Sequence, residues 1–204
     1  MIRVDPDACT PADLAAACAW IAGGGIVAYP TDTFYGLAVD PASAEAVQAL
    51  FDAKGREASM AMPLIAASAA QVETIAELDA ASRRLADAFW PGPLSLVLTA
   101  RPVIAPAVHA GRGTVAVRVP AHRVAQALAE GCGRPITATS ANRSGQPPVA
   151  VAADLDAIAR DPRVLVVDGG TTPGGRPSTI VDARGVPQLV REGAIPWSRV
   201  LDCR

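Results

Sequence analysis

The sequence predicts an α/β fold built as one domain. Segments with the periodicity of amphipathic helices alternate with short apolar runs typical of buried strands. The 204 residues amount to about one domain at roughly 150 residues per domain. Half of the residues are hydrophobic and 19% are charged, which provides a core and excludes a disordered chain. We therefore expect a single domain over residues 1–204, with its core in about residues 10–195.

Start and stop signals indicate where the helices lie. Thr10 is a candidate N-cap, Pro11 suits the first helical position, and a helix is expected from there to about Ala22. The three glycines at 23–25 end this helix. Polar starts followed by helical spacing predict the remaining helices at Ser43–Ala53, Ala69–Ala76, Asp79–Phe89, His122–Glu130 and Ala152–Ala159.

Short apolar runs that stop at polar or turn-forming residues predict the strands. The expected strands are Ile26–Pro30, Pro63–Ala67, Leu94–Thr99, Thr114–Val119, Ile136–Thr139, Val164–Asp168, Ser178–Asp182 and Gln188–Arg191. The sequence contains no internal repeat and no low-complexity linker longer than the loop at 169–177. This pattern favours one compact domain.

The charge balance argues against a dedicated nucleic-acid-binding protein. Lys and Arg total 18 against 20 Asp and Glu, which gives a formal charge of −2, whereas a protein that grips a phosphate backbone is usually basic. Aromatic residues make up only 4% of the chain, too few for base-stacking platforms. A local basic pocket is compatible with both numbers.

The cysteines indicate a reducing compartment. Cys9, Cys18, Cys132 and Cys203 form no CxxC pair, and two histidines add no zinc-ligand spacing. No basic segment leads into an apolar signal region at the N-terminus, and no long uncharged apolar run occurs. We therefore expect a cytoplasmic protein without a membrane association and without a metal site of its own.

Several common catalytic signatures are absent from the sequence. It contains no GxxxxGK[ST], no GxGxxG after a strand, no GxSxG and no HExxH. Polar residues gather instead where predicted strands end, which is where open α/β sheets bind ligands. The segment Pro30–Leu37 combines hydroxyls, a carboxylate and a phenol, although a capped turn explains the same residues. The segment Thr137–Gly145 suits a polar ligand or forms a local Ser/Asn turn.

Basic residues mark three further segments. Lys54 and Arg56 flank a glycine and can hold a phosphate, but cations are also expected at a helix C-terminus because of the helix dipole. Arg118 lies within an apolar strand, so it meets a buried carboxylate, faces an anionic ligand or points to solvent from an edge strand. The basic loop Gly174–Thr179 is either a lid or an exposed connection.

Taken in order, these segments resemble the YrdC-like family. The resemblance rests on Pro30–Leu37, Lys54-Gly55-Arg56, Trp90–Leu94, Val117–Pro120, Ser140-Ala141-Asn142 with Ser144-Gly145, and Ser178–Asp182. It covers the chain from about Ile26 to Arg191 and is similar to the short, single-domain bacterial type. It implies a twisted, mixed sheet flanked by helices, with a concave ligand-binding surface.

Characterised members of the YrdC-like family are L-threonylcarbamoyladenylate synthases, so the resemblance implies a nucleotidyltransferase. The implied reaction joins L-threonine, bicarbonate or CO2, and ATP into threonylcarbamoyl-AMP with release of pyrophosphate, for the modification of tRNA. The implied partners are a downstream tRNA threonylcarbamoyl transferase complex and a weak contact with tRNA. Mg²⁺ is expected to arrive with ATP, because the sequence shows no dedicated carboxylate cage.

The resemblance also implies roles for individual residues. The implied ATP-binding residues are Lys54, Arg56, Thr114, Ser140, Asn142, Pro148 and Arg191. The implied threonine-binding residues are Thr33, Tyr35, Arg118, Ala138 and Ser178. Lys54, Arg56 and Arg118 are expected to be the catalytic cations, because negative charge builds up on phosphorus oxygens and on the leaving pyrophosphate. Replacing Arg118 by alanine is expected to abolish threonine-dependent activity and to leave the fold intact.

Two positions depart from the family pattern. Glu57 follows the basic motif where many relatives have proline, and Ala67 stands where some relatives have a histidine.

Two alternative functions stay open. One is a paralogue with the same fold and a different carbamoyl-type reaction or none. The other is an RNA-binding module, which the net charge and the scarcity of aromatic residues disfavour.

Overall fold

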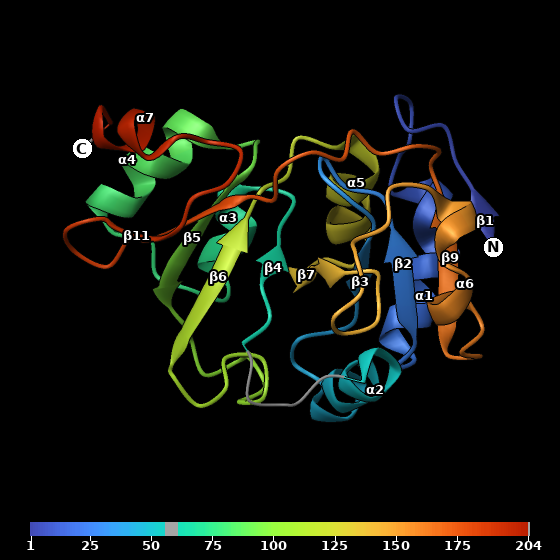
Figure 1. Cartoon of the computed structure of the whole chain (residues 1–204). Helices are drawn as coiled ribbons and strands as arrows, with labels where there is room; N and C mark the ends of the chain where they lie inside the picture. The colour runs from blue at the N-terminus through green and yellow to red at the C-terminus, as the bar shows by residue number, and fades with distance from the viewer. Residues whose placement is uncertain (56–60, 204) are drawn as a thin grey trace.

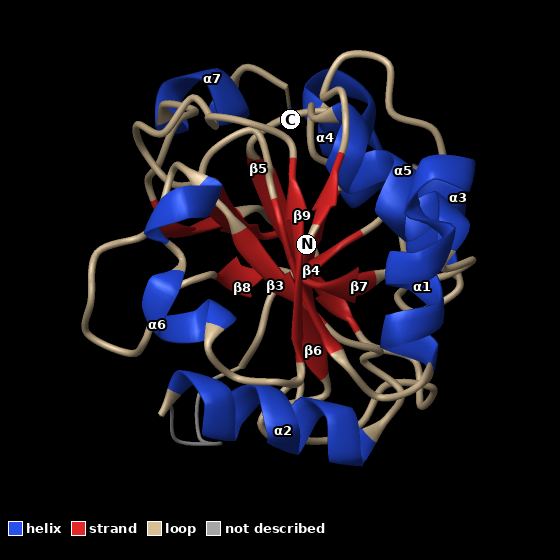
Figure 2. Ribbon diagram, turned by 90° about the vertical axis from the view of Figure 1, so that its right-hand side faces the viewer, coloured by secondary structure: helices blue, strands red, loops and turns tan. Residues whose placement is uncertain are grey.

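The fold consists of two mixed sheets that lie side by side and are enclosed by helices (Figure 1; Figure 2). The computed structural model describes residues 1–55 and 61–203. Within them, the five-stranded sheet has the order β1 (Ile2–Arg3), β9 (Val164–Asp168), β2 (Ile26–Tyr29), β3 (Gly36–Ala38), β8 (Thr139–Ser140). The six-stranded sheet has the order β11 (Gln188–Arg191), β10 (Thr179–Asp182), β5 (Leu94–Thr99), β6 (Thr114–Arg118), β4 (Leu64–Ile65), β7 (Ile136–Thr137). The predicted α/β class is confirmed, with the strands divided between two sheets.

The helices surround the strands on several sides (Figure 2). They are η1 (Ala12–Leu14), α1 (Ala15–Ala22), α2 (Ala44–Lys54), α3 (Ala69–Glu73), α4 (Ala80–Phe89), α5 (Arg123–Gly131), η2 (Ala152–Asp154), α6 (Asp156–Ala159) and α7 (Trp197–Leu201). Three of the predicted starts are confirmed, because the Ser43, Ser68 and Asp79 side chains each accept a backbone N–H three residues onward. None of the helices within residues 1–55 and 61–203 is long and apolar enough to cross a membrane.

Two predicted helices begin or continue differently. Thr10 does not cap the first helix; its N–H and hydroxyl instead donate to Asp13 Oδ2 at 2.9 and 2.7 Å. The chain therefore enters α1 through the 3₁₀ turn η1. The helix predicted over 152–159 is interrupted at Leu155, which separates η2 from α6. The short elements β1, β3 and α7 were not predicted.

The predicted strand Ile136–Thr139 is divided between the two sheets. Its first half, β7, pairs with β4, and its second half, β8, pairs with β3. The Thr137 hydroxyl donates to Leu37 O at 3.1 Å and accepts from Val39 N at 2.9 Å, which joins the sheets where the chain crosses. Ala138 lies at this crossing, so the polar residues that follow it open onto the space between the sheets.

Thr179 anchors the C-terminal segment to the six-stranded sheet. Its fully buried hydroxyl donates to Ile195 O at 2.6 Å and accepts from Gly193 N at 2.9 Å and Ile195 N at 3.0 Å. Gly193 is required by this contact, because a Cβ there would lie 2.1 Å from Pro177 O. The hydroxyl thus fixes the return of the chain beside β10.

Replacing Thr179 by valine is expected to lower the free energy of unfolding by about 2–4 kcal/mol, because it leaves buried backbone groups without partners. Thr179→Ser retains the hydroxyl and is expected to cost about 1 kcal/mol for the lost methyl group. Urea unfolding of both variants measures the difference. Equal losses in the two variants would contradict the role of the hydroxyl.

Candidate functional site

A cleft of about 770 Å³ lies between the two sheets. Ten of the twelve predicted site residues line it: Thr33, Tyr35, Thr114, Arg118, Ala138, Ser140, Asn142, Pro148, Ser178 and Arg191. Arg112, which was not predicted, also lines it. Among the lining residues that the structure describes there are three arginines and no Asp or Glu. The cleft is therefore suited to an anionic ligand.

Arg118 ends β6 in the six-stranded sheet and forms an ion pair with Asp32, which follows β2 in the five-stranded sheet. The two side chains are only 8% and 10% exposed. The second carboxylate oxygen accepts the N–H of Ala121 at 3.2 Å. Arg118 thus combines two of the roles considered from the sequence: it meets a buried carboxylate and also lines the cleft. Asp32 was missed as its partner, although it directly follows a buried strand.

The turn after β2 presents Thr33 to the cleft. The Thr31 hydroxyl donates to Phe34 O at 2.7 Å and accepts from Thr33 N at 3.2 Å, which fixes the turn. The two threonine hydroxyls lie 3.2 Å apart. Gly174 N donates to Thr33 O at 2.7 Å, so the loop at 169–177 is tied to this turn at the cleft wall.

Tyr35 belongs to the cleft lining, and its hydroxyl is bonded to the loop at 169–177. Its side chain is fully buried, and its hydroxyl donates to Gly170 O at 2.7 Å and accepts from Gly169 N at 3.3 Å. Burial raises the pKa of this phenol. The Tyr35 hydroxyl therefore anchors the base of the 169–177 loop, and its contact with threonine stays a prediction.

Lys54 lies at the end of α2 and is buried. Its ammonium group donates to Ser140 O and to Asn142 O, the latter at 2.8 Å. Lys54 is not among the residues that line the cleft. Its contacts with these two backbone oxygens hold the 140–142 segment in place. Arg56 and Glu57 lie outside the described residues. Direct contacts of Lys54 and Arg56 with ATP stay predictions.

The side chain of Asn142 carries a buried oxygen without a hydrogen-bond partner among the described residues, which is a candidate ligand contact. Its Nδ2 donates to Arg143 O at 2.9 Å and to Gln146 O at 2.6 Å, whereas its Oδ1 has no partner among the described residues. Buried polar atoms are seldom left unsatisfied. Ser140 is exposed in the same cleft. An amide and a hydroxyl oxygen suit Mg²⁺ that arrives with a phosphate, and residues 1–55 and 61–203 hold no cluster of three Asp, Glu, His or Cys.

The other wall of the cleft combines hydroxyls with a second cation. Ser95 Oγ and Ser178 Oγ lie 3.0 Å apart, and Arg191 Nη2 donates to Ser178 O at 2.8 Å. Burial lowers the pKa of the Arg191 guanidinium, which nevertheless stays charged at neutral pH. Arg191 is thereby fixed beside the residue predicted to contact threonine.

The fold and cleft define an α/β protein with a cleft between two mixed sheets whose described lining suits an anionic ligand. A protein-family model described as "Telomere recombination", the Sua5/YciO/YrdC family, matches residues 19–193. The chain belongs to this family. The resemblance inferred from the order of its short motifs is thereby confirmed.

Relatives named "Threonylcarbamoyl-AMP synthase" match most of the chain. One from Thiobacillus denitrificans is 41% identical over 165 residues, which cover 80% of this chain and 87% of the relative. One from Pyrococcus abyssi is 39% identical over 186 residues, covering 90% of this chain but 55% of the relative. The chain thus spans about half the length of the P. abyssi relative.

Solved structures show the same fold. The structure titled "Crystal structure of P. abyssi Sua5 complexed with L-threonine" matches with a TM-score of 0.91 and 36% identity, covering 100% of this chain and 61% of that one. The structure of E. coli YciO matches with a TM-score of 0.83 at 23% identity, covering 96% of each chain. The second match supports the fold alone.

The buried pair changes the expectation for Arg118→Ala. Removing the guanidinium leaves Asp32 buried without its partner, so we expect a loss of about 3 kcal/mol in the free energy of unfolding. The double variant Asp32→Asn/Arg118→Gln removes both charges and is expected to lose less. Urea unfolding compares the two, and a double variant less stable than Arg118→Ala would contradict an uncompensated charge as the cause.

His122 gives the structure a pH dependence. Burial lowers the pKa of this imidazole, and its Nδ1 has no partner within the part of the chain that the structure describes. The unfolded chain takes up a proton near pH 6.5, whereas folded His122 binds it less readily because its pKa is lower, so stability falls as the pH drops below about 6.5. We expect His122→Gln to lose less stability than the native chain between pH 7.5 and 5.5 in urea unfolding. Equal losses would exclude His122 as the source.

Proposed function

We propose that this chain catalyses the ATP-dependent synthesis of L-threonylcarbamoyladenylate from L-threonine and bicarbonate or CO2. The cleft carries the proposal, because it gathers three arginines and several hydroxyls without a carboxylate in its described lining. The names of the relatives and the threonine complex of a similar structure support the same reaction. A different reaction on the same fold has no comparable support.

The threonine site is proposed at the seam between the sheets. Arg118 is the cation placed to pair with the substrate carboxylate, and the guanidinium fork suits that geometry. The fixed turn holds Thr33 in the lining of the same cleft. Ala138 offers backbone contacts at the crossing, and Ser178 closes the opposite wall.

The nucleotide is proposed to occupy the cleft beside the 140–148 segment. Ser140, Asn142 and Thr114 provide oxygen and amide groups for the phosphates, and Pro148 and Arg191 lie along the nucleotide. The unpartnered Asn142 Oδ1 and the Ser140 hydroxyl are the groups proposed to hold Mg²⁺. When bound, Mg²⁺ would neutralise phosphate charge. Lys54 shapes the segment from behind through its carbonyl contacts.

The chemistry needs positioning and positive charge rather than a protein nucleophile. Carboxylation of the threonine amine forms a C–N bond and gives a carbamate, with a proton released when CO2 reacts and water released when bicarbonate reacts. A carbamate oxygen then attacks the α-phosphorus of ATP. A new P–O bond forms, the bond to pyrophosphate breaks, and the bonding electron pair leaves with pyrophosphate. Arginines that face the reacting phosphate stabilise the charge that develops there. The activated threonylcarbamoyl group is then proposed to pass to a tRNA-modifying transferase complex, with a weak contact to tRNA.

The test is pyrophosphate release with ATP, Mg²⁺ and bicarbonate, with and without L-threonine. Threonine-dependent release, with serine and valine as poorer substrates, is the expected result. A folded chain that binds ATP but releases no pyrophosphate would exclude the synthase and favour a paralogue. Affinity for RNA that falls steeply with salt, together with indifference to threonine, would favour an RNA-binding module.

Replacing Asn142 by alanine is expected to raise the KM for ATP about tenfold, because it removes the unpartnered acceptor proposed for the metal-bound phosphates. Titration of Mg²⁺ at fixed ATP is expected to shift in the same direction. Ser144→Ala is the matched control, since Ser144 is exposed on the same segment and outside the cleft lining. The same KM for ATP in both variants would remove Asn142 from the nucleotide site.

A further inference from the structure

We propose that Asp32 is a positioning residue that aims the Arg118 guanidinium at the carboxylate of the amino-acid substrate. This inference rests on the proposed function, and it assigns a role to a residue that touches no substrate. Asp32 is absent from the described lining of the cleft, whereas its neighbours Thr31 and Thr33 belong to it. Asp32 therefore contacts Arg118 without itself belonging to the described lining of the cleft.

The ion pair leaves one edge of the guanidinium available. Arg118 Nη1 donates to Asp32 Oδ1, and no other hydrogen bond of this side chain involves the described residues. Nε and Nη2 thus remain as donors on a side chain that is 8% exposed and lines the cleft. Two parallel N–H groups that face the cleft match the two oxygens of a carboxylate. The bond on Nη1 sets the rotation of the planar group and therefore the direction of those donors.

Asp32 also connects two parts of the proposed threonine site. Its Oδ1 pairs with Arg118 at the end of β6, and its Oδ2 accepts from Ala121 N at 3.2 Å, three residues further along the same chain segment. Asp32 itself belongs to the turn that carries Thr33, on the other sheet. The carboxylate thereby holds the Thr33 turn and the Arg118 guanidinium in one fixed relation across the cleft.

A free arginine side chain loses rotamer entropy when it binds a ligand, and prior fixation avoids that loss. Asp32→Asn removes the charge that fixes Arg118 while it keeps the size of the side chain. Because Arg118 would bind threonine in both the ground state and the transition state, the loss should appear in KM rather than in kcat.

The test is steady-state pyrophosphate release by Asp32→Asn. We expect the KM for L-threonine to rise about tenfold, with kcat and the KM for ATP within about twofold of the native enzyme. Because a merely structural role would change both KM values together or lower only the melting temperature, either of those results overturns the proposal. An unchanged KM for threonine overturns it as well.

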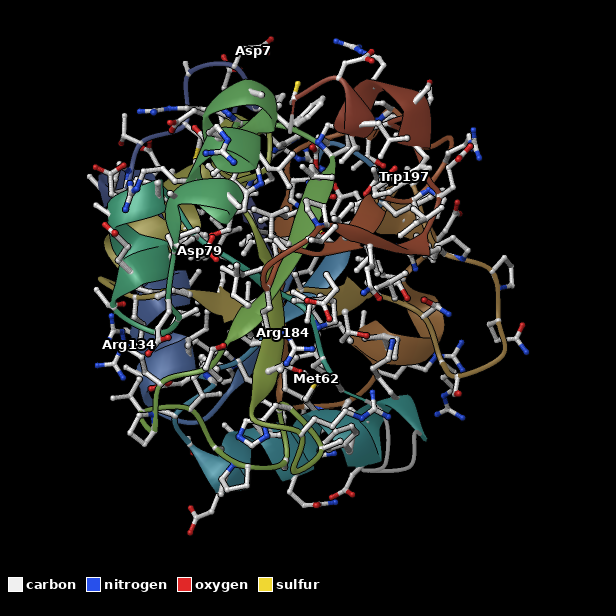
Figure 3. All side chains as sticks on the ribbon, turned by 90° about the vertical axis from the view of Figure 1, so that its left-hand side faces the viewer. Asp7, Met62, Asp79, Arg134, Arg184 and Trp197 are labelled. Carbon is white, nitrogen blue, oxygen red and sulfur yellow. The ribbon has the colours of Figure 1, made fainter. Side chains whose placement is uncertain are left out.

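Asp40→Asn is the matched control. Asp40 also places one oxygen on an arginine, Arg134 at 2.9 Å, and the other on a backbone N–H, Ala42 at 2.9 Å. Neither Asp40 nor Arg134 lines the cleft, and Figure 3 shows Arg134 at the rim of the molecule. We expect this variant to leave the KM for threonine unchanged. A rise equal to that of Asp32→Asn would overturn the specific role of Asp32.

If Asp32→Asn does not fold, Asp32→Glu takes its place, since it keeps the charge but displaces it by one methylene group. A raised KM for threonine with an unchanged KM for ATP supports the proposal, and a native KM for threonine overturns it.

The activity of the native enzyme distinguishes failure of this inference from failure of the proposed function. Threonine-dependent release by the native enzyme with an unaffected Asp32 variant rejects the inference alone, whereas no release by the native enzyme rejects the function.

Discussion

The seam between the two sheets is the constraint on which the cleft depends. The chain crosses it at Ala138, between β7 and β8, and the Thr137 hydroxyl holds β3 on the far side. Because hydroxyl and amide residues follow the crossing directly, the polar segment opens into the space between the sheets. The site therefore follows from a division of four residues between two sheets.

A buried cation beside such a cleft needs a compensating partner, and that partner must not occupy the cleft itself. Arg118 pairs with Asp32, which is outside the described lining, and Lys54 donates to the carbonyl oxygens of Ser140 and Asn142. Both arrangements compensate the charge and leave the described lining without a carboxylate. An anionic substrate then meets guanidinium groups that are already oriented, which reduces the entropy lost on binding. Electrostatic preorganisation of this kind matches a reaction in which negative charge moves onto a leaving group.

Local sequence signals predicted the longer elements because each has a clear beginning and end. The strands Leu94–Thr99, Val164–Asp168 and Gln188–Arg191 agree with the structure at both ends, since apolar or alternating runs are bounded there by turn-forming residues. The strands β1 and β3 contain two and three residues, too few to show a period of two. The division of Ile136–Thr139 depends on contacts with two different partners, which no local pattern contains.

The site shows the same boundary between local and distant information. Motif order identified ten residues that the structure brings to one cleft, yet it left three alternatives open for Arg118. Its partner Asp32 lies 86 positions away in the sequence and follows a strand of the other sheet, so no local pattern could identify it. For Lys54 the sequence could not distinguish two roles, because a cation at the end of a helix shows the same local pattern whether it binds a phosphate or backbone oxygens. In the fold it contacts the backbone carbonyls of Ser140 and Asn142, and a direct contact with a phosphate stays a prediction.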